Sequence, residues 1–151
     1  MTEVRRSVTV RATPDRAFEV FVTKFADWWP LSSHHIGESD AATATIEPFE
    51  GGRWFERGVD GSECDWGAVL AYEPPTRLLL SWHLDGRWSY DPDPARASEV
   101  ELTFEPEGAT TVVTLVHRHF ERHAVDPGRI AKQVAGGGGW GGLLEMYAAV
   151  V

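Results

Sequence analysis

The chain has 151 residues, a formal charge of −9 and one cysteine, Cys64. This length is typical of a single domain that buries about 70% of its unfolded surface without disulfide support, so residues 1–151 are predicted to form one domain. The 23 acidic residues outnumber the 14 basic ones, and no lysine or arginine cluster is present, which argues against a nucleic-acid partner. No apolar run is long enough for a membrane span and no signal-peptide pattern precedes the chain's first strand, so a cytoplasmic location is expected.

The N-terminal part of the chain predicts one strand followed by two helices. Valines alternate with polar residues over 4–11, which is the period of a half-buried strand. Thr13-Pro14 is typical of a helix start, and apolar residues at helical spacing extend the predicted helix to about residue 25. Asp27-Trp28-Trp29-Pro30 then predicts a turn or a second short helix.

A polar loop and six strands are predicted for the middle of the chain. The loop covers 31–42, and its adjacent histidines, His34 and His35, are expected to be exposed to solvent. The predicted strands are 44–48, 53–57, 64–72, 77–84, 99–106 and 110–120. Because most of the breaks between them are short and rich in glycine or proline, antiparallel hairpins are favoured over parallel crossovers.

The last segment, from about residue 126, predicts a long helix. Asp126-Pro127 repeats the pattern of a cap followed by proline, and apolar residues recur at helical spacing up to Tyr147. The glycines at 136–139 disfavour a helix, because each costs about 1 kcal/mol relative to alanine. The helix is therefore expected from Trp140 onward, and its continuity before that residue stays open.

This order of elements predicts an α+β domain. Six or seven antiparallel strands form a curved sheet around the long C-terminal helix, with two short helices after the first strand. The sheet and the terminal helix need not touch everywhere, and a gap between them would hold a ligand.

Several motifs resemble those of one superfamily in their order and spacing. They are Trp28-Trp29-Pro30, Pro48-Phe49-Glu50-Gly51-Gly52-Arg53-Trp54, Trp66-Gly67-Ala68-Val69 and Gly139-Trp140-Gly141-Gly142-Leu143-Leu144. The chain resembles the START/Bet v 1-like (SRPBCC) superfamily, and within it the branch similar to the C-terminal domain of the activator of Hsp90 ATPase. The resemblance implies the helix-grip fold and, for many relatives, a hydrophobic cavity between the sheet and the C-terminal helix. It implies neither a metal nor a particular reaction.

The high aromatic content, seven Trp, seven Phe and three Tyr, supplies side chains for the walls of such a cavity. Strand alternation places Trp66 on the same face as Leu70, and His117 on the same face as His119. The predicted ligand contacts are Phe21, Trp28, Trp66, Trp82, His117, Trp140 and Leu144. The alternative is that these side chains pack on one another and leave no void.

Candidates for chemistry are fewer. His117, His119 and His123 together with Cys64 do not have the spacing of a zinc site, so neither a metal site nor a cofactor is predicted. A buried acid beside a histidine can perform general acid–base catalysis. The carboxylates nearest the predicted cavity are Glu56, Glu63, Asp65 and Glu145.

Three functions stay open at this point. Binding of a small, largely apolar molecule is favoured, with no catalytic residue assigned. An enzyme of the cyclase or hydratase type would use the same cavity. A chaperone-linked interaction module would instead expose an apolar patch around Trp88 and Tyr90, in the long break 85–97, which could equally cover the cavity. An uncovered edge strand would support a homodimer.

Overall fold

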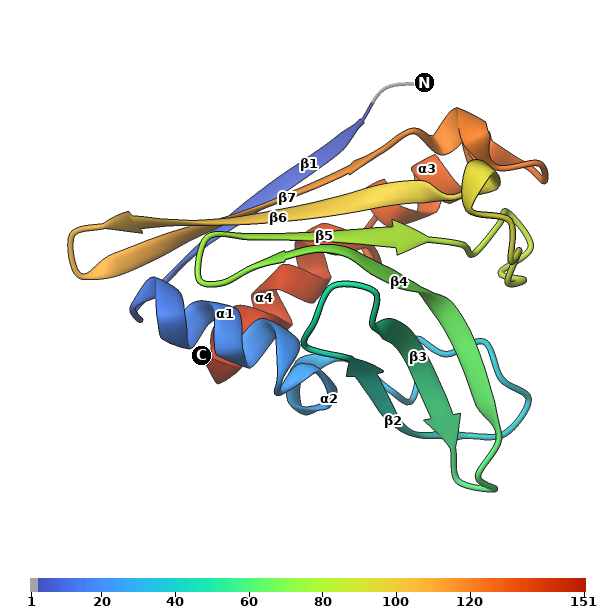
Figure 1. Cartoon of the computed structure of the whole chain (residues 1–151), viewed down its shortest axis with the longest axis horizontal. Coiled ribbons are helices and arrows are strands. Elements are labelled where there is room, and N and C mark those ends of the chain that lie inside the picture. Colours follow the sequence, from blue (N-terminus) through green and yellow to red (C-terminus); the bar gives the residue numbers. More distant parts are fainter. Residues whose placement is uncertain (1–2) are drawn as a thin grey trace.

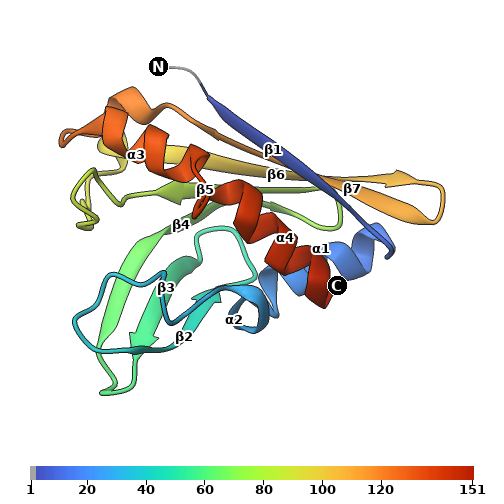
Figure 2. The same ribbon diagram turned by 180° about the vertical axis from the view of Figure 1, so that it is seen from behind.

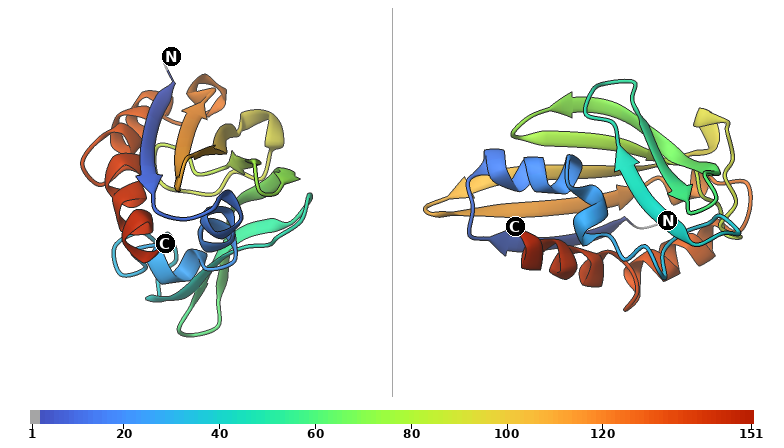
Figure 3. Two further views of the ribbon diagram at one scale, coloured as in Figure 1. Left: turned by 90° about the vertical axis from the view of Figure 1, so that its left-hand side faces the viewer. Right: turned by 90° about the horizontal axis from the view of Figure 1, so that it is seen from below.

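The computed structural model describes residues 3–151, which form a seven-stranded antiparallel sheet with the main helices on one side (Figure 1). The strands are β1 (Val4–Val10), β2 (Ala41–Ile46), β3 (Arg53–Gly58), β4 (Glu63–Glu73), β5 (Arg77–Trp82), β6 (Ser98–Glu107) and β7 (Thr110–Arg118). Their order in the sheet is β1-β7-β6-β5-β4-β3-β2, so every pair except β1–β7 joins strands that are consecutive in sequence. The sheet curls around the helices, as the left view of Figure 3 shows, and the predicted α+β fold with a curved antiparallel sheet is confirmed.

The first and third helices begin where the capping signals predict, at Pro14 and Pro127. The four helices are α1 (Pro14–Val22), α2 (Phe25–Trp28), α3 (Pro127–Ala135) and α4 (Trp140–Val150), with two 3-10 turns, η1 (Pro94–Arg96) and η2 (Phe120–Arg122). The Thr13 hydroxyl accepts the Arg16 N–H at 3.2 Å, and Asp126 accepts the Arg129 N–H at 3.3 Å. The expectation of one helix over 14–25 is wrong, because the chain leaves α1 after Val22. Among residues 3–151, no helix has the length and apolar character needed to cross a bilayer.

The glycine segment 136–139 separates α3 from α4, which Figure 2 shows as two successive helices. Gly139 lies so close to the preceding helix that a Cβ at this position would overlap the backbone of Val134. Only glycine allows this approach, and the long helix is therefore divided in two. The part predicted from Trp140 onward is α4.

Two bulges in β4 change which of its residues face the helices. Trp66 is an extra residue opposite β3, and Leu70 is an extra residue opposite β5. Each bulge shifts the alternation of side chains by one position. Leu70 is consequently 40% exposed whereas Val69 is buried, so the predicted common face for Trp66 and Leu70 is wrong.

The end of β7 also departs from simple alternation. His117 is fully buried within the strand, but the strand stops at Arg118 and His119 adopts a left-handed conformation with φ 68°. The side chain of His119 is 38% exposed and approaches Glu99 on the surface. The prediction that both histidines share a buried face is therefore wrong.

Gly67 in the first bulge of β4 is expected to be intolerant of a side chain. A Cβ at Gly67 would overlap the backbone carbonyl of Ser81 on β5, so Gly67→Ala must push two paired strands apart. We expect a loss of about 3 kcal/mol in the free energy of unfolding, measured by urea denaturation. Gly128→Ala is the control, because no atom lies within 4 Å of its added Cβ and alanine favours helix α3. Equal denaturation midpoints for the two variants would contradict the prediction.

Candidate ligand-binding site

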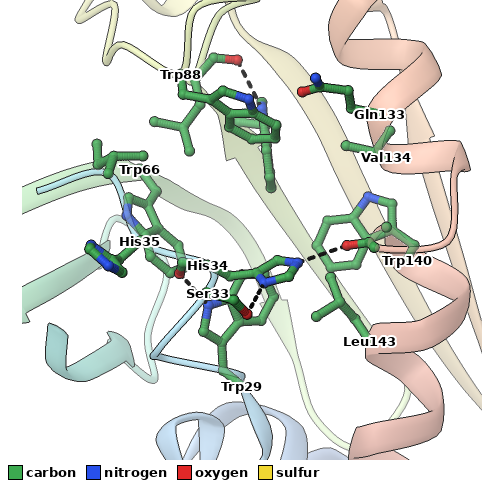
Figure 4. A pocket seen from close by; sticks show the side chains of 15 residues that line it. Trp29, Ser33, His34, His35, Trp66, Trp88, Gln133, Val134, Trp140 and Leu143 are labelled. Atoms are coloured by element: carbon green, nitrogen blue, oxygen red, sulfur yellow. Dashed lines mark hydrogen bonds between the residues drawn. The ribbon is translucent and has the colours of Figure 1, made fainter. Parts of the chain in front are cut away.

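A pocket of about 430 Å³ lies at one end of the interface between the sheet and the C-terminal helices (Figure 4). Its sides come from β4 and β5, the segment 33–36, the loop after β5, and the junction of α3 with α4. Five of the lining residues are tryptophans: Trp29, Trp66, Trp82, Trp88 and Trp140. We call this feature the tryptophan pocket.

Four of these indole rings are fixed by hydrogen bonds from their N–H groups to the protein. The bonds join Trp29 to the His34 carbonyl (2.9 Å), Trp66 to the Glu56 carboxylate (2.8 Å), Trp82 to the Leu84 carbonyl (2.9 Å) and Trp140 to His117 Nδ1 (3.0 Å). A ring held in this way cannot rotate without leaving a buried N–H unpaired. These four rings therefore line the pocket with apolar surfaces in fixed positions.

Trp88 reaches the pocket from the loop after β5. Its φ of 59° is unusual for a bulky residue, and conformations of this kind cost about 1–3 kcal/mol. The loop supports it, because the Asp85 carboxylate accepts the N–H groups of Arg87 and Ser89 and the Asp85 carbonyl accepts that of Trp88. The Trp88 ring centroid lies 6.1 Å from that of Trp82, so the loop forms one wall of the pocket.

A buried chain of polar groups supports Trp140 from behind. His117 Nδ1 accepts the Trp140 N–H, and its Nε2 lies 2.8 Å from the Ser98 hydroxyl, which is also 2.8 Å from His123 Nε2. Since the indole can only donate, His117 carries its proton on Nε2. Burial holds the pKa of His117 well below its usual value of 6.5, and burial also lowers the pKa of His123.

Two histidines occupy the edge of the pocket. His34 Nε2 lies 2.7 Å from the Gly138 carbonyl and its Nδ1 lies 2.8 Å from the Ser33 hydroxyl, so this ring bridges segments 104 positions apart (Figure 4). His35 lies beside Trp66, with Nδ1 3.1 Å from the Gly37 carbonyl. Both residues are half-buried, and the expectation that they are exposed to solvent is wrong. The partner of His34, the Gly138 carbonyl, lies in the break between α3 and α4. No local sequence pattern indicates this contact.

Of the four candidate carboxylates, only Glu56 is buried, with 1% exposure. It accepts the N–H groups of Ile36 (2.6 Å) and Gly37 (3.2 Å) as well as that of Trp66. Glu56 therefore attaches the segment that follows His34 and His35 to the sheet. Glu63 and Asp65 pair with Arg53 at the surface, and Glu145 is exposed. Within residues 3–151, no three His, Cys, Asp or Glu side chains are grouped to hold a metal ion.

The structure distributes the seven predicted ligand contacts between the pocket and the core. Trp66, Trp82 and Trp140 line the pocket. His117 lies behind Trp140, and the other three, Phe21, Trp28 and Leu144, belong to the core. There Phe21 and Trp28 pack on Tyr147, with centroid distances of 5.3 and 5.4 Å, and fill the space nearer α1 and α2. Trp88, His34 and His35 also line the pocket, although they are not among the predicted ligand contacts.

Comparisons with known proteins agree with this architecture. Residues 11–150 match the model of the family described as activator of Hsp90 ATPase homolog 1-like protein. Comparison with curated proteins gives no match. Among solved structures, the chain is similar to an anthrahydroquino-γ-pyrone synthase, Txn09, with 40% identity and a TM-score of 0.70, covering 100% of this chain and 97% of that chain.

Two further structures are more distant. CalC, a self-sacrificing resistance protein from Micromonospora echinospora, is 29% identical with a TM-score of 0.69, covering 98% of this chain and 92% of that chain. Protein MLL2253 from Mesorhizobium loti is 20% identical with a TM-score of 0.67, covering 99% and 96%, and shows the shared fold. The family match, which spans nearly the whole chain, establishes that this protein belongs to the activator of Hsp90 ATPase homolog 1-like family of the SRPBCC superfamily.

Proposed function

We propose that this protein binds a flat, polycyclic aromatic molecule in the tryptophan pocket. The observation that carries the proposal is five indole rings around one space of about 430 Å³, a size usual for small-molecule sites. Because four of the rings direct their N–H groups into the protein, recognition relies on ring surfaces, which favour aromatic partners in stacked or edge-to-face contact. Trp66, Trp82 and Trp140 are proposed as direct contacts, together with Trp29 and Trp88.

The polar groups of the pocket favour a neutral or phenolic ligand over a carboxylic acid. Among the described residues that line it, none is lysine or arginine, so no permanently charged cation is available to pair with a carboxylate. Hydrogen-bonding side chains are confined to Ser33, His34, His35 and Gln133, in addition to the indoles. A flat ligand with hydroxyl or carbonyl groups along one edge could pack its rings on the indoles and form hydrogen bonds with these polar side chains.

The relative with 40% identity supports the same class of ligand. Its name describes a synthase for an anthrahydroquinone joined to a γ-pyrone, which is a flat, fused aromatic system with oxygen substituents. The similarity covers the whole of this chain, including the elements that build the pocket.

Binding is testable with dihydroxyanthraquinone as the probe. Titration into the wild-type protein is expected to quench tryptophan fluorescence with saturation. Trp88→Ala should raise the dissociation constant about tenfold, because one aromatic wall is lost. Tyr90→Ala, in the same loop but outside the pocket lining, is the control and should bind as the wild type does. A wild-type protein that shows no saturable quenching would contradict the proposal.

The second candidate function is ring closure on the same ligand class, as an enzyme of the cyclase type. It is favoured by the similarity to a γ-pyrone synthase and by imidazole groups at the edge of an apolar pocket. A γ-pyrone fused to an aromatic ring forms when the phenol of an ortho-hydroxyaryl β-diketone adds to the distal ketone and one water is lost. An interaction surface around Trp88 is less favoured, because Trp88 lines the pocket instead of extending an exposed patch.

A further inference from the structure

The two histidines at the pocket edge differ in how many of their ring nitrogens are hydrogen-bonded to the protein. In His35, the Gly37 carbonyl lies 3.1 Å from Nδ1, and since a carbonyl can only accept, Nδ1 carries the proton. The lone pair is then on Nε2, for which residues 3–151 provide no hydrogen-bond partner. In His34, both nitrogens are engaged, by Gly138 and by Ser33.

Glu56 provides His35 with a fixed position and a negative charge. Its carboxylate accepts the N–H groups of the two residues that follow His35 in the chain, Ile36 and Gly37, and Oε2 lies 4.0 Å from His35 Nδ1. The carboxylate is almost fully buried, so its field is poorly screened by water. Glu56 thus fixes the backbone that follows His35 and places a buried carboxylate beside its ring.

Cys64 does not compete with His35 as a base. It pairs with Glu56 across β3 and β4, and burial, followed by the charge of Glu56, raises the pKa of its thiol. The thiol thus stays protonated at neutral pH, and the imidazole is the available proton acceptor.

We propose that His35 is the general base of the ring closure, with Glu56 as its positioning residue; this inference rests on the ring-closing function proposed above. His35 Nε2 takes the proton of the substrate phenol as the phenolic oxygen forms a bond to the ketone carbon. The π electrons of the carbonyl move to its oxygen, which takes up the proton that His35 Nε2 accepted, so that a cyclic hemiketal forms and His35 returns to its neutral state. Loss of that hydroxyl with a neighbouring C–H proton releases water and forms the ring C=C bond. One water leaves, and no oxidant or reductant takes part.

An ortho-hydroxyaryl β-diketone, followed by the absorbance of the γ-pyrone product, tests the assignment. His35→Gln is expected to lower kcat about a hundredfold or more, the usual contribution of a general base. Dihydroxyanthraquinone should still quench tryptophan fluorescence with saturation, and its dissociation constant should rise much less than kcat falls, because glutamine keeps a hydrogen-bonding side chain at the pocket edge. Free imidazole should restore part of the rate in His35→Ala. His119→Gln, a histidine outside the pocket, is the matched control and should keep the wild-type kcat.

The remaining variants separate a chemical role from a structural one. Glu56→Gln should lower kcat by about tenfold with a smaller change in KM, whereas a merely structural role would raise KM and the dissociation constant instead. His34→Gln should affect KM more than kcat. If His35→Gln retains the wild-type kcat, or if His34→Gln loses as much, the assignment to His35 is overturned and the ring-closing function stands. If the wild type binds the anthraquinone but does not convert the diketone, ring closure and the role of His35 fail together and the binding function remains.

Discussion

His117→Ala is expected to lower the free energy of unfolding by about 4 kcal/mol. The side chain is fully buried, and its ring centroid lies 4.3 Å from that of Phe120 and 5.1 Å from that of Trp82. Truncation leaves a cavity, which by itself costs about 2–5 kcal/mol for large side chains. It also leaves the buried Trp140 N–H without its acceptor, a further loss of about 1–3 kcal/mol that relaxation of the site offsets in part.

Urea denaturation of the wild type, His117→Ala and His119→Ala measures this effect. His119 is two positions further along but lies at the surface, so its truncation should change stability by less than about 0.5 kcal/mol. Because Trp140 loses its anchor, His117→Ala should also weaken quenching by the anthraquinone. Similar losses in the two variants would show that the buried polar chain is not a major source of stability.

Mild acid is expected to destabilise the protein through the same histidine. The pKa of His117 is lowered in the folded state, so below about pH 6.5 the unfolded chain binds a proton that the folded chain does not. The stabilising contribution is complete above that pH and decreases as the pH falls, by about 1.4 kcal/mol per pH unit while the native ring stays neutral. His123, whose pKa is shifted in the same direction, adds to the slope.

Denaturation midpoints between pH 7.5 and pH 5 check this prediction. His117→Phe removes one titrating group and keeps a ring in the same space, so its stability should depend on pH less steeply than that of the wild type, even though its absolute stability is lower. Equal slopes for the two proteins would assign the acid sensitivity to other groups.

Local sequence patterns determined most of the secondary structure. Thr13-Pro14 and Asp126-Pro127 mark the helix starts because the cap and the proline act on the backbone next to them. The strands of the middle section follow from alternation and turn residues, and the short turns between them require antiparallel neighbours. These features depend on residues only a few positions apart, and for that reason the α+β fold was predictable.

The tertiary structure decided which side chains form the pocket. The bulges at Trp66 and Leu70 depend on the register with two neighbouring strands, and each reverses the faces that alternation predicts. The division between α3 and α4 depends on the close contact of Gly139 with Val134. Because the helix is interrupted there, the Gly138 carbonyl is free to bond with His34, which is 104 positions earlier in the chain. Sequence composition predicted aromatic walls, but it could not separate Trp88 and Trp140, which line the pocket, from Phe21 and Trp28, which fill the core. That division depends on how the curved sheet and the two helices meet in space, and such contacts between distant segments leave no local pattern in the sequence.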